Sequence, residues 1–129
     1  MDNRSIPPCG KVLFIEEIHE IISMANSSVD GKSVRVTGRL ERHNTESSTA
    51  VLVDPRSNKS LLIDTRLIEP FPEKLGSLFQ FIGELEGVDR SLDVTLRARV
   101  VRCVDGLDLA LYNQAIKAQR EFLKQDINS

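Results

Sequence analysis

The side chains that most often carry catalysis or bind metals are few in this sequence, and they lie far apart. The two histidines are His19 and His43, and neither stands beside a Cys or Ser nucleophile in a recognisable motif. The two cysteines, Cys9 and Cys103, have no Cys or His neighbours at the spacing of a zinc site. We therefore expect solvated histidines, reduced thiols, and a chain that is not an enzyme and uses no metal or cofactor.

Basic side chains in the first half of the chain are stronger candidates, because cations can contact the phosphates of a nucleic acid. They lie on a predicted strand, in the loop after it and around a hairpin turn: Arg35, Arg39, Arg42, Arg56 and Lys59. Alternatively, these residues keep a strand face soluble or pair with neighbouring glutamates. The predicted last loop contains Asp89, Arg90 and Asp93, and its net negative charge would repel phosphate. We expect at most a supporting contact with DNA.

The overall charge limits nucleic-acid binding further. The 129 residues include 17 Lys and Arg against 19 Asp and Glu, which gives a formal net charge of −2, and aromatic residues make up only 5%. A protein that binds nucleic acid by itself normally has an excess of positive charge and several aromatic rings on which bases stack. The composition therefore argues against autonomous binding.

An apolar face on the last segment is the second candidate for binding. Residues 107–125 contain no Gly or Pro, and one apolar row recurs at helical spacing: Leu111, Ala115, Ala118 and Phe122. Beside it runs a second apolar row of Tyr112, Ile116 and Leu123, and the polar residues are expected to face away: Asn113, Lys117, Arg120 and Lys124. Such a face is wide for a helix that covers one small domain, and the two alanines would let another helix approach closely. The segment is predicted to be a partner-binding helix.

The elements that would position these residues follow from the period of the apolar side chains. Residues 1–10 contain two adjacent prolines and a glycine, which predict a flexible lead, and residues 11–129 are predicted to form one domain. A short strand is expected at 12–15. From 16 to 25, apolar residues at three- and four-residue spacing predict a short amphipathic helix.

Five later segments are predicted to be strands, at residues 33–42, 49–53, 61–63, 78–86 and 94–104. The first, fourth and fifth alternate between apolar and polar side chains, which is typical of half-buried strands, and the second is a run of β-forming residues. A turn at 54–58 joins the second and third of them into a hairpin. Gly38 and Gly83 suit the corners of a barrel, where a side chain would obstruct the bend. In the last strand, Val100 is expected to point inward, with a bulge at Val100-Val101 that keeps Arg102 out of the core.

Five strands, a gap between the third and fourth, and a terminal helix match the OB-fold, a small five-stranded Greek-key barrel. The predicted fold class is therefore mainly β: a single OB-fold barrel with a short N-terminal helix and a long C-terminal α-helix. The strand count alone leaves SH3-like barrels open. No apolar run approaches the roughly 20 residues of a membrane span, so no membrane association is expected.

The second half of the chain also contains a series of short motifs. They are Leu67-Ile68-Glu69-Pro70-Phe71, Gly76-Ser77-Leu78-Phe79, Gly83-Glu84-Leu85, Ala98-Arg99-Val100, Cys103-Val104-Asp105-Gly106-Leu107, Gln114-Ala115-Ile116 and Gln119-Arg120. Their order and spacing resemble the Ten-one family, the smallest subunit of the telomeric CST complex, which is similar to the smallest subunit of replication protein A. The resemblance covers residues 65–125, and Gly38-Arg39-Leu40 fits the first strand of the family.

The resemblance implies a non-enzymatic subunit that binds the middle CST subunit, itself an OB-fold protein, and through it the large subunit. The family's partner contacts fall here on Leu107, Leu111, Tyr112 and Phe122, to which the helical pattern adds Ala115 and Ala118. The complex would bind single-stranded telomeric DNA, protect chromosome ends in the nucleus and assist DNA polymerase alpha-primase. The alternatives are the small subunit of a replication protein A-like complex and a general protein-binding module. The Ile-rich N-terminal helix has no obvious counterpart in animal members.

Overall fold

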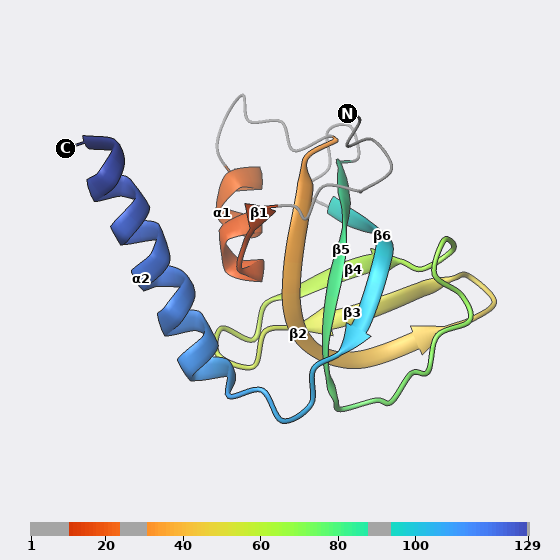
Figure 1. Cartoon of the computed structure of the whole chain (residues 1–129). Coiled ribbons are helices and arrows are strands. Elements are labelled where there is room, and N and C mark those ends of the chain that lie inside the picture. Colours follow the sequence, from red (N-terminus) through yellow and green to blue (C-terminus); the bar gives the residue numbers. More distant parts are fainter. Residues whose placement is uncertain (1–10, 24–30, 88–93, 129) are drawn as a thin grey trace, which may run out of the picture.

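The computed structural model, shown in Figure 1, describes residues 11–23, 31–87 and 94–128, with side chains as far as Leu123. Its elements in chain order are β1 (Lys11–Val12), α1 (Ile15–Ser23), β2 (Ser33–Asn44), β3 (Thr49–Val53), β4 (Ser60–Asp64), β5 (Leu78–Gly87), β6 (Val94–Cys103) and α2 (Leu109–Asn128). The predicted succession of a short helix, five strands and a terminal helix is confirmed. The predicted flexible lead lies outside the described residues.

Strand β2 closes the barrel because it is long enough to pair with two different strands. The sheet order is β1-β2-β3-β4-β6-β5, and β5 returns to pair with β2. The first half of β2 runs antiparallel to β5 and the second half antiparallel to β3, with Arg39 at the changeover. Strands β4 and β6 pair in parallel, and the two-residue β1 adds to the edge of β2. This arrangement confirms the OB-fold prediction.

The interior of the barrel holds the side chains that the alternation places inward. The fully buried members include Val34, Val36, Leu40, Leu52, Leu61, Ile63, Phe79, Phe81, Leu85 and Leu96. Helix α1 joins the same cluster through Ile15 and Ile18, which are both fully buried. The Ile-rich helix is therefore part of the core, and its position relative to the barrel is fixed by packing.

Strand β6 changes its alternation one residue earlier than predicted. Ala98 is buried, Arg99 and Val100 are both exposed, and Val101 packs against the core. The register between β5 and β6 shifts at this point, because Ile82 pairs with Val100 while the next residue of β5 pairs with Ala98. The predicted bulge is confirmed, but the inward orientation of Val100 is wrong, since Arg99 is the extra residue.

The prediction that His43 is a solvated loop residue is also wrong. His43 lies near the end of β2, and its side chain is only 2% exposed. Its Nε2 lies 2.7 Å from Oε2 of Glu69, its Nδ1 bonds to Glu73, and its ring centre lies 4.8 Å from that of Phe71. These contacts hold the connection between β4 and β5 against the barrel.

The contacts of His43 predict that the stability of the fold depends on pH. Burial opposes the charged imidazolium, but the hydrogen bonds and charges of Glu69 and Glu73 outweigh it and hold the pKa of His43 above its ordinary value. The stabilisation is therefore complete below the ordinary pKa of about 6.5, and it is lost as the pH rises through the higher folded value. Denaturant unfolding of the wild type and His43→Gln should show a larger stability difference at about pH 6 than at about pH 8.

The matched control is His19→Gln, because the imidazole of His19 contacts the backbone carbonyl of Ser60 at 2.7 Å instead of two carboxylates. A stability difference between wild type and His43→Gln that stays constant with pH would mean that the carboxylates do not hold the proton of His43.

Candidate partner-binding interface

Helix α2 begins at a cap made by Asp108. The chain turns at Gly106, whose φ is +89°, and Oδ1 of Asp108 then accepts the N–H of Leu111 at 3.1 Å. An aspartate at this position satisfies a backbone N–H that the first turn leaves without a helical partner. The cap places Leu107 in the turn before the helix, half-buried, with its N–H donating to the carbonyl of Val104. The helix therefore starts two residues later than the predicted segment 107–125.

One face of α2 rests on the outer side of the barrel, where Tyr112 and Ile116 are half-buried and Asn113 is buried. The side-chain amide of Gln80, on β5, donates to the hydroxyl of Tyr112 at 3.4 Å and to Oγ1 of Thr37 at 3.0 Å. Gln80 is thus buried although the alternation places it outward. The prediction that Asn113 faces away from the barrel is wrong, because around the helix its position lies next to that of Ile116, on the side away from Tyr112, and this face packs on the barrel.

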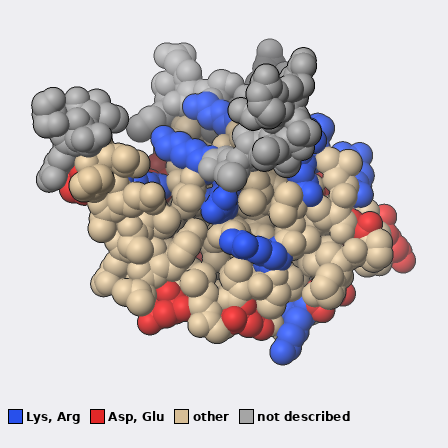
Figure 2. Space-filling model, in the orientation of Figure 1, with Lys and Arg blue, Asp and Glu red and all other residues tan. Residues whose placement is uncertain are grey.

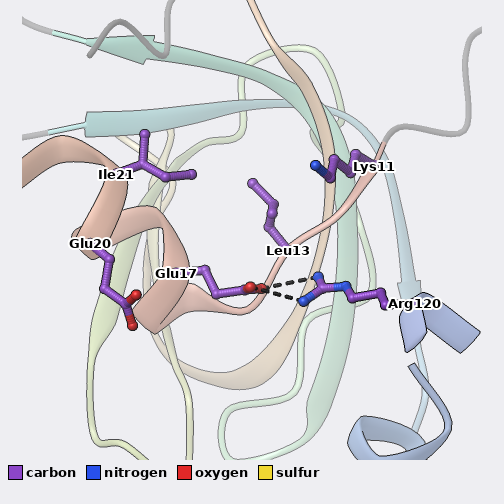
Figure 3. A pocket seen from close by; sticks show the side chains of 6 residues that line it. All are labelled: Lys11, Leu13, Glu17, Glu20, Ile21 and Arg120. Atoms are coloured by element: carbon purple, nitrogen blue, oxygen red, sulfur yellow. Dashed lines mark hydrogen bonds and ion pairs between the residues drawn. The ribbon is translucent and has the colours of Figure 1, made fainter. Parts of the chain in front are cut away.

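Arg120 was also expected on the face turned away, and this is wrong as well. Its guanidinium forms an ion pair with Glu17 of α1 and closes one side of a hollow of about 340 Å³, which Figure 3 shows. The contact joins two residues that are 103 positions apart in the sequence. No local pattern could have indicated it.

The opposite face of α2 carries the apolar row of Leu111, Ala115, Ala118 and Phe122, which we call the α2 row. All four residues are exposed, and the two large side chains, Leu111 and Phe122, retain 62% and 67% of their accessible surface. Figure 1 shows α2 along one side of the barrel with its far end directed away from the strands, and the visible side of the helix is mostly free of charged side chains in Figure 2. An exposed apolar row of this length is typical of a docking surface.

Of the residues predicted to bind a partner, the structure brings the four members of the α2 row together and separates the other two. Tyr112 faces the barrel through its contact with Gln80, and Leu107 precedes the helix. Leu123 is half exposed and lies beside the row. The exposed surface is therefore narrower than the combined apolar face of the helix, because the second apolar row is used for internal packing.

The residues predicted to contact nucleic acid lie along β2 and in the turn between β3 and β4. Arg39 is paired with Glu41, and Arg35 is half-buried between the paired residues Val12 and Ile82 of the neighbouring strands. The other three predicted nucleic-acid residues, Arg42, Arg56 and Lys59, are exposed. The predicted acidic loop lies outside the described residues.

Further arginines are neutralised by acids on adjacent segments, in the pairs Arg66 with Asp64, Arg97 with Glu86 and Arg99 with Glu84. Within the described ranges, no group of three or more His, Cys, Asp or Glu residues could hold a metal ion. In the same part of the chain, no helix is both long and apolar enough to cross a membrane. Among the described residues, the α2 row is therefore the strongest candidate for a functional surface.

Comparison with known proteins shows the family to which the chain is similar. A family model described as "Telomere-capping, CST complex subunit" matches residues 6–126. The CST complex subunit TEN1 of Arabidopsis thaliana is 39% identical over 100 residues, which cover 78% of this chain and 77% of that protein. The human CST complex subunit TEN1 is 34% identical over 98 residues, which cover 74% of this chain and 79% of that protein.

Two solved structures share the fold at low sequence identity. The S. pombe Stn1-Ten1 complex matches with a TM-score of 0.69 at 17% identity, covering 89% of this chain and 95% of that chain. A crystal structure of yeast Stn1 and Ten1 matches with a TM-score of 0.55 at 13% identity, covering 87% and 73%. With the family match over nearly its whole length, the chain belongs to the telomere-capping CST complex subunits, a family of structural subunits that are not enzymes.

Proposed function

We propose that this chain is the smallest subunit of a CST complex and that its main task is to bind the middle OB-fold subunit through the α2 row. The observation that carries the proposal is the exposure of Leu111 and Phe122 on a helix whose other face already packs on the barrel. The similar S. pombe and yeast structures, in which Ten1 is found with Stn1, support this choice of partner.

The chemistry of the α2 row fits a helix or an apolar groove of the partner. Ala115 and Ala118 lie between the two large side chains, so a partner element can approach the backbone there while Leu111 and Phe122 pack on either side. Burial of those two side chains would contribute on the order of 3 to 6 kcal/mol before the costs of association. That range is enough to make the α2 row the dominant part of an interface.

Through the middle subunit, the chain would join the large subunit and act in the nucleus at telomeres. The assembled complex would bind single-stranded telomeric DNA, protect chromosome ends and support fill-in by DNA polymerase alpha-primase. The share of this chain in that work is assembly, because a net charge of −2 supplies little attraction for phosphates.

Affinity purification of the full-length chain from nuclear extract, with mass spectrometry of the bound proteins, tests the proposal. We expect the middle CST subunit as the main partner. Recovery of the large replication protein A subunits instead would favour the replication role. A chain that stays monomeric and binds neither partner would favour a general protein-binding module.

The purified chain alone should bind single-stranded DNA weakly. In a gel-shift assay with a telomeric single strand at low salt, we expect no shifted band below about 10 µM protein, because the net charge is −2 and several arginines are paired with acids. The triple variant Arg42→Glu, Arg56→Glu, Lys59→Glu serves as the control and should behave as the wild type does. A shift by the wild type that the triple variant loses would show direct DNA binding by this surface.

A further inference from the structure

Arg120 joins helix α2 to helix α1, next to Lys117, whose Nζ lies 5.8 Å from the centre of the Phe14 ring. Nη1 of Arg120 donates to Oε2 of Glu17 at 2.8 Å, and Nη2 donates to Oε1 at 3.0 Å, so the guanidinium grips both carboxylate oxygens, as Figure 3 shows. Nη2 also donates to the backbone carbonyl of Val12 at 2.5 Å, and the guanidinium carbon lies 4.9 Å from the centre of the Phe14 ring. One side chain of α2 therefore contacts β1, the connection after β1 and α1.

Glu17 is held in place from its own side. Its Oε1 also accepts the N–H of Phe14 at 2.8 Å, an arrangement that caps the first turn of α1. Burial opposes the charged form of Glu17, but the hydrogen bonds from Arg120 and Phe14 and the charge of Arg120 outweigh it and hold the pKa of Glu17 below its ordinary value. Ile15 and Ile18 are buried in the core and fix the position of α1. The charged carboxylate of Glu17 therefore offers Arg120 a binding partner in a fixed position.

The ion pair between Glu17 and Arg120 is partly shielded from solvent, and its two hydrogen bonds fix the relative orientation of the two side chains. The two side chains are 29% and 35% exposed, and they border the hollow drawn in Figure 3, whose other charged side chains are Lys11 and Glu20. Two-point pairing of a guanidinium with a carboxylate fixes the relative orientation of the groups as well as their distance. Exposed lysine pairs do not impose this geometry, because an ammonium is a point charge on a flexible chain.

The position of Arg120 along α2 explains how its ion pair with Glu17 can fix the direction of the helix. The helix touches the outer side of the barrel near its start through Tyr112, and Arg120 lies eight residues later, about 12 Å along the axis. The described side chains beyond it, from Glu121 to Leu123, are exposed. A helix held only near its start can change direction, whereas a second attachment point fixes it. Phe122 lies two residues beyond Arg120, so its position depends directly on that attachment.

We propose that Glu17 and Arg120 form a latch that holds α2 in the direction in which the α2 row meets the partner. Helix α1 thereby takes part in partner binding without touching the partner. The inference rests on the proposed function, in which the α2 row is the docking surface. Both residues are positioning residues: they make the binding-competent direction the dominant one, so that the partner does not have to select it from a broad distribution.

The test compares two glutamines in the first turn of α1. Glu17→Gln keeps an oxygen that can accept the N–H of Phe14 but removes the charge that Arg120 grips. Glu16→Gln removes an exposed carboxylate one residue earlier and is the matched control. In calorimetric titrations of the full-length chain with the middle CST subunit, Glu17→Gln should weaken binding about tenfold, and Glu16→Gln should bind as the wild type does. Arg120→Lys, which keeps the charge without the two-point grip, should fall between them.

A second measurement reports the direction of α2 without the partner. Spin labels at Glu46→Cys, in the β2–β3 loop, and Gln119→Cys, on α2, are placed in a background whose two native cysteines are replaced by serine. The distribution of distances between the labels should broaden with Glu17→Gln and stay narrow with Glu16→Gln. It should also stay narrow with Leu111→Glu, Phe122→Glu, which alters the α2 row and leaves the latch intact.

The combined results separate the latch from the proposed function. If Glu17→Gln keeps a narrow distribution and wild-type affinity while the Leu111→Glu, Phe122→Glu variant loses binding, the latch is wrong and the proposed function stands. If the latter variant binds as the wild type does, the proposed function fails, and with it the role of the latch in partner binding.

Discussion

The double variant Leu111→Glu, Phe122→Glu is expected to lose co-purification with the middle CST subunit while its barrel remains folded. Both side chains are exposed, at 62% and 67%, so their replacement removes little internal packing. At the interface, each substitution removes an apolar contact and places a carboxylate where it has to be desolvated. The loss of both contacts alone should raise the dissociation constant by a factor of about 100 or more.

The matched control carries the same substitutions at two other exposed leucines. Leu67 and Leu75, at 57% and 59% exposure, lie on the connection between β4 and β5 and not on α2. The variant Leu67→Glu, Leu75→Glu changes the net charge equally and should bind the partner as the wild type does. Circular dichroism and thermal unfolding of both variants check the fold. Survival of the complex with the Leu111→Glu, Phe122→Glu variant would show that α2 is not the interface.

Gly83→Ala should destabilise the fold more than any surface variant considered above. A Cβ at this position would lie 1.9 Å from the carbonyl oxygen of Arg97, 2.7 Å from its carbonyl carbon and 2.9 Å from Cα of Ala98. All three atoms belong to the backbone of β6, so no side-chain rotation can relieve the overlap. Strands β5 and β6 would have to separate beside their bulge, and we expect a loss of about 3 kcal/mol in the free energy of unfolding.

Gly38→Ala is the comparison for this prediction. Its Cβ would approach the carbonyl oxygen of Val53 to 2.8 Å and the side chain of Leu52 to 2.9 Å. This overlap is smaller than that at Gly83, and part of it is with a side chain that can move. Urea denaturation followed by circular dichroism should therefore rank the wild type above Gly38→Ala and Gly38→Ala above Gly83→Ala. A Gly83→Ala protein as stable as the wild type would contradict the close approach of the two strands.

The strands and their inward faces were predictable because alternation is a local property of the chain. The even positions from Val34 to Leu40 are buried as predicted, and the hairpin of β3 and β4 lies where its turn residues place it. The bulge in β6 was predictable from the need to keep Arg102 out of the core. Its position was not, since the choice between Arg99 and Val100 as the extra residue depends on the pairing with β5.

The face of α2 that turns outward could not be chosen from the helical pattern. The row of Leu111 and Phe122 and the row of Tyr112 and Ile116 are both apolar, so either could pack on the barrel. The contacts of Tyr112 with Gln80 and of Arg120 with Glu17 determine which face of α2 packs against the rest of the protein. Each of them joins the helix to a distant part of the chain.

By itself, the sequence determined the class of the fold, the order of its elements, the shortage of catalytic and phosphate-binding groups, and the motifs shared with the telomere-capping family. Only the tertiary structure decided that His43 is clamped by two glutamates, that Gln80 is buried on an outer face, and that Arg120 latches α2 to α1. The periods of strands and helices arise between near neighbours. A buried polar group, in contrast, takes the partners that barrel closure brings to it from any distance along the chain.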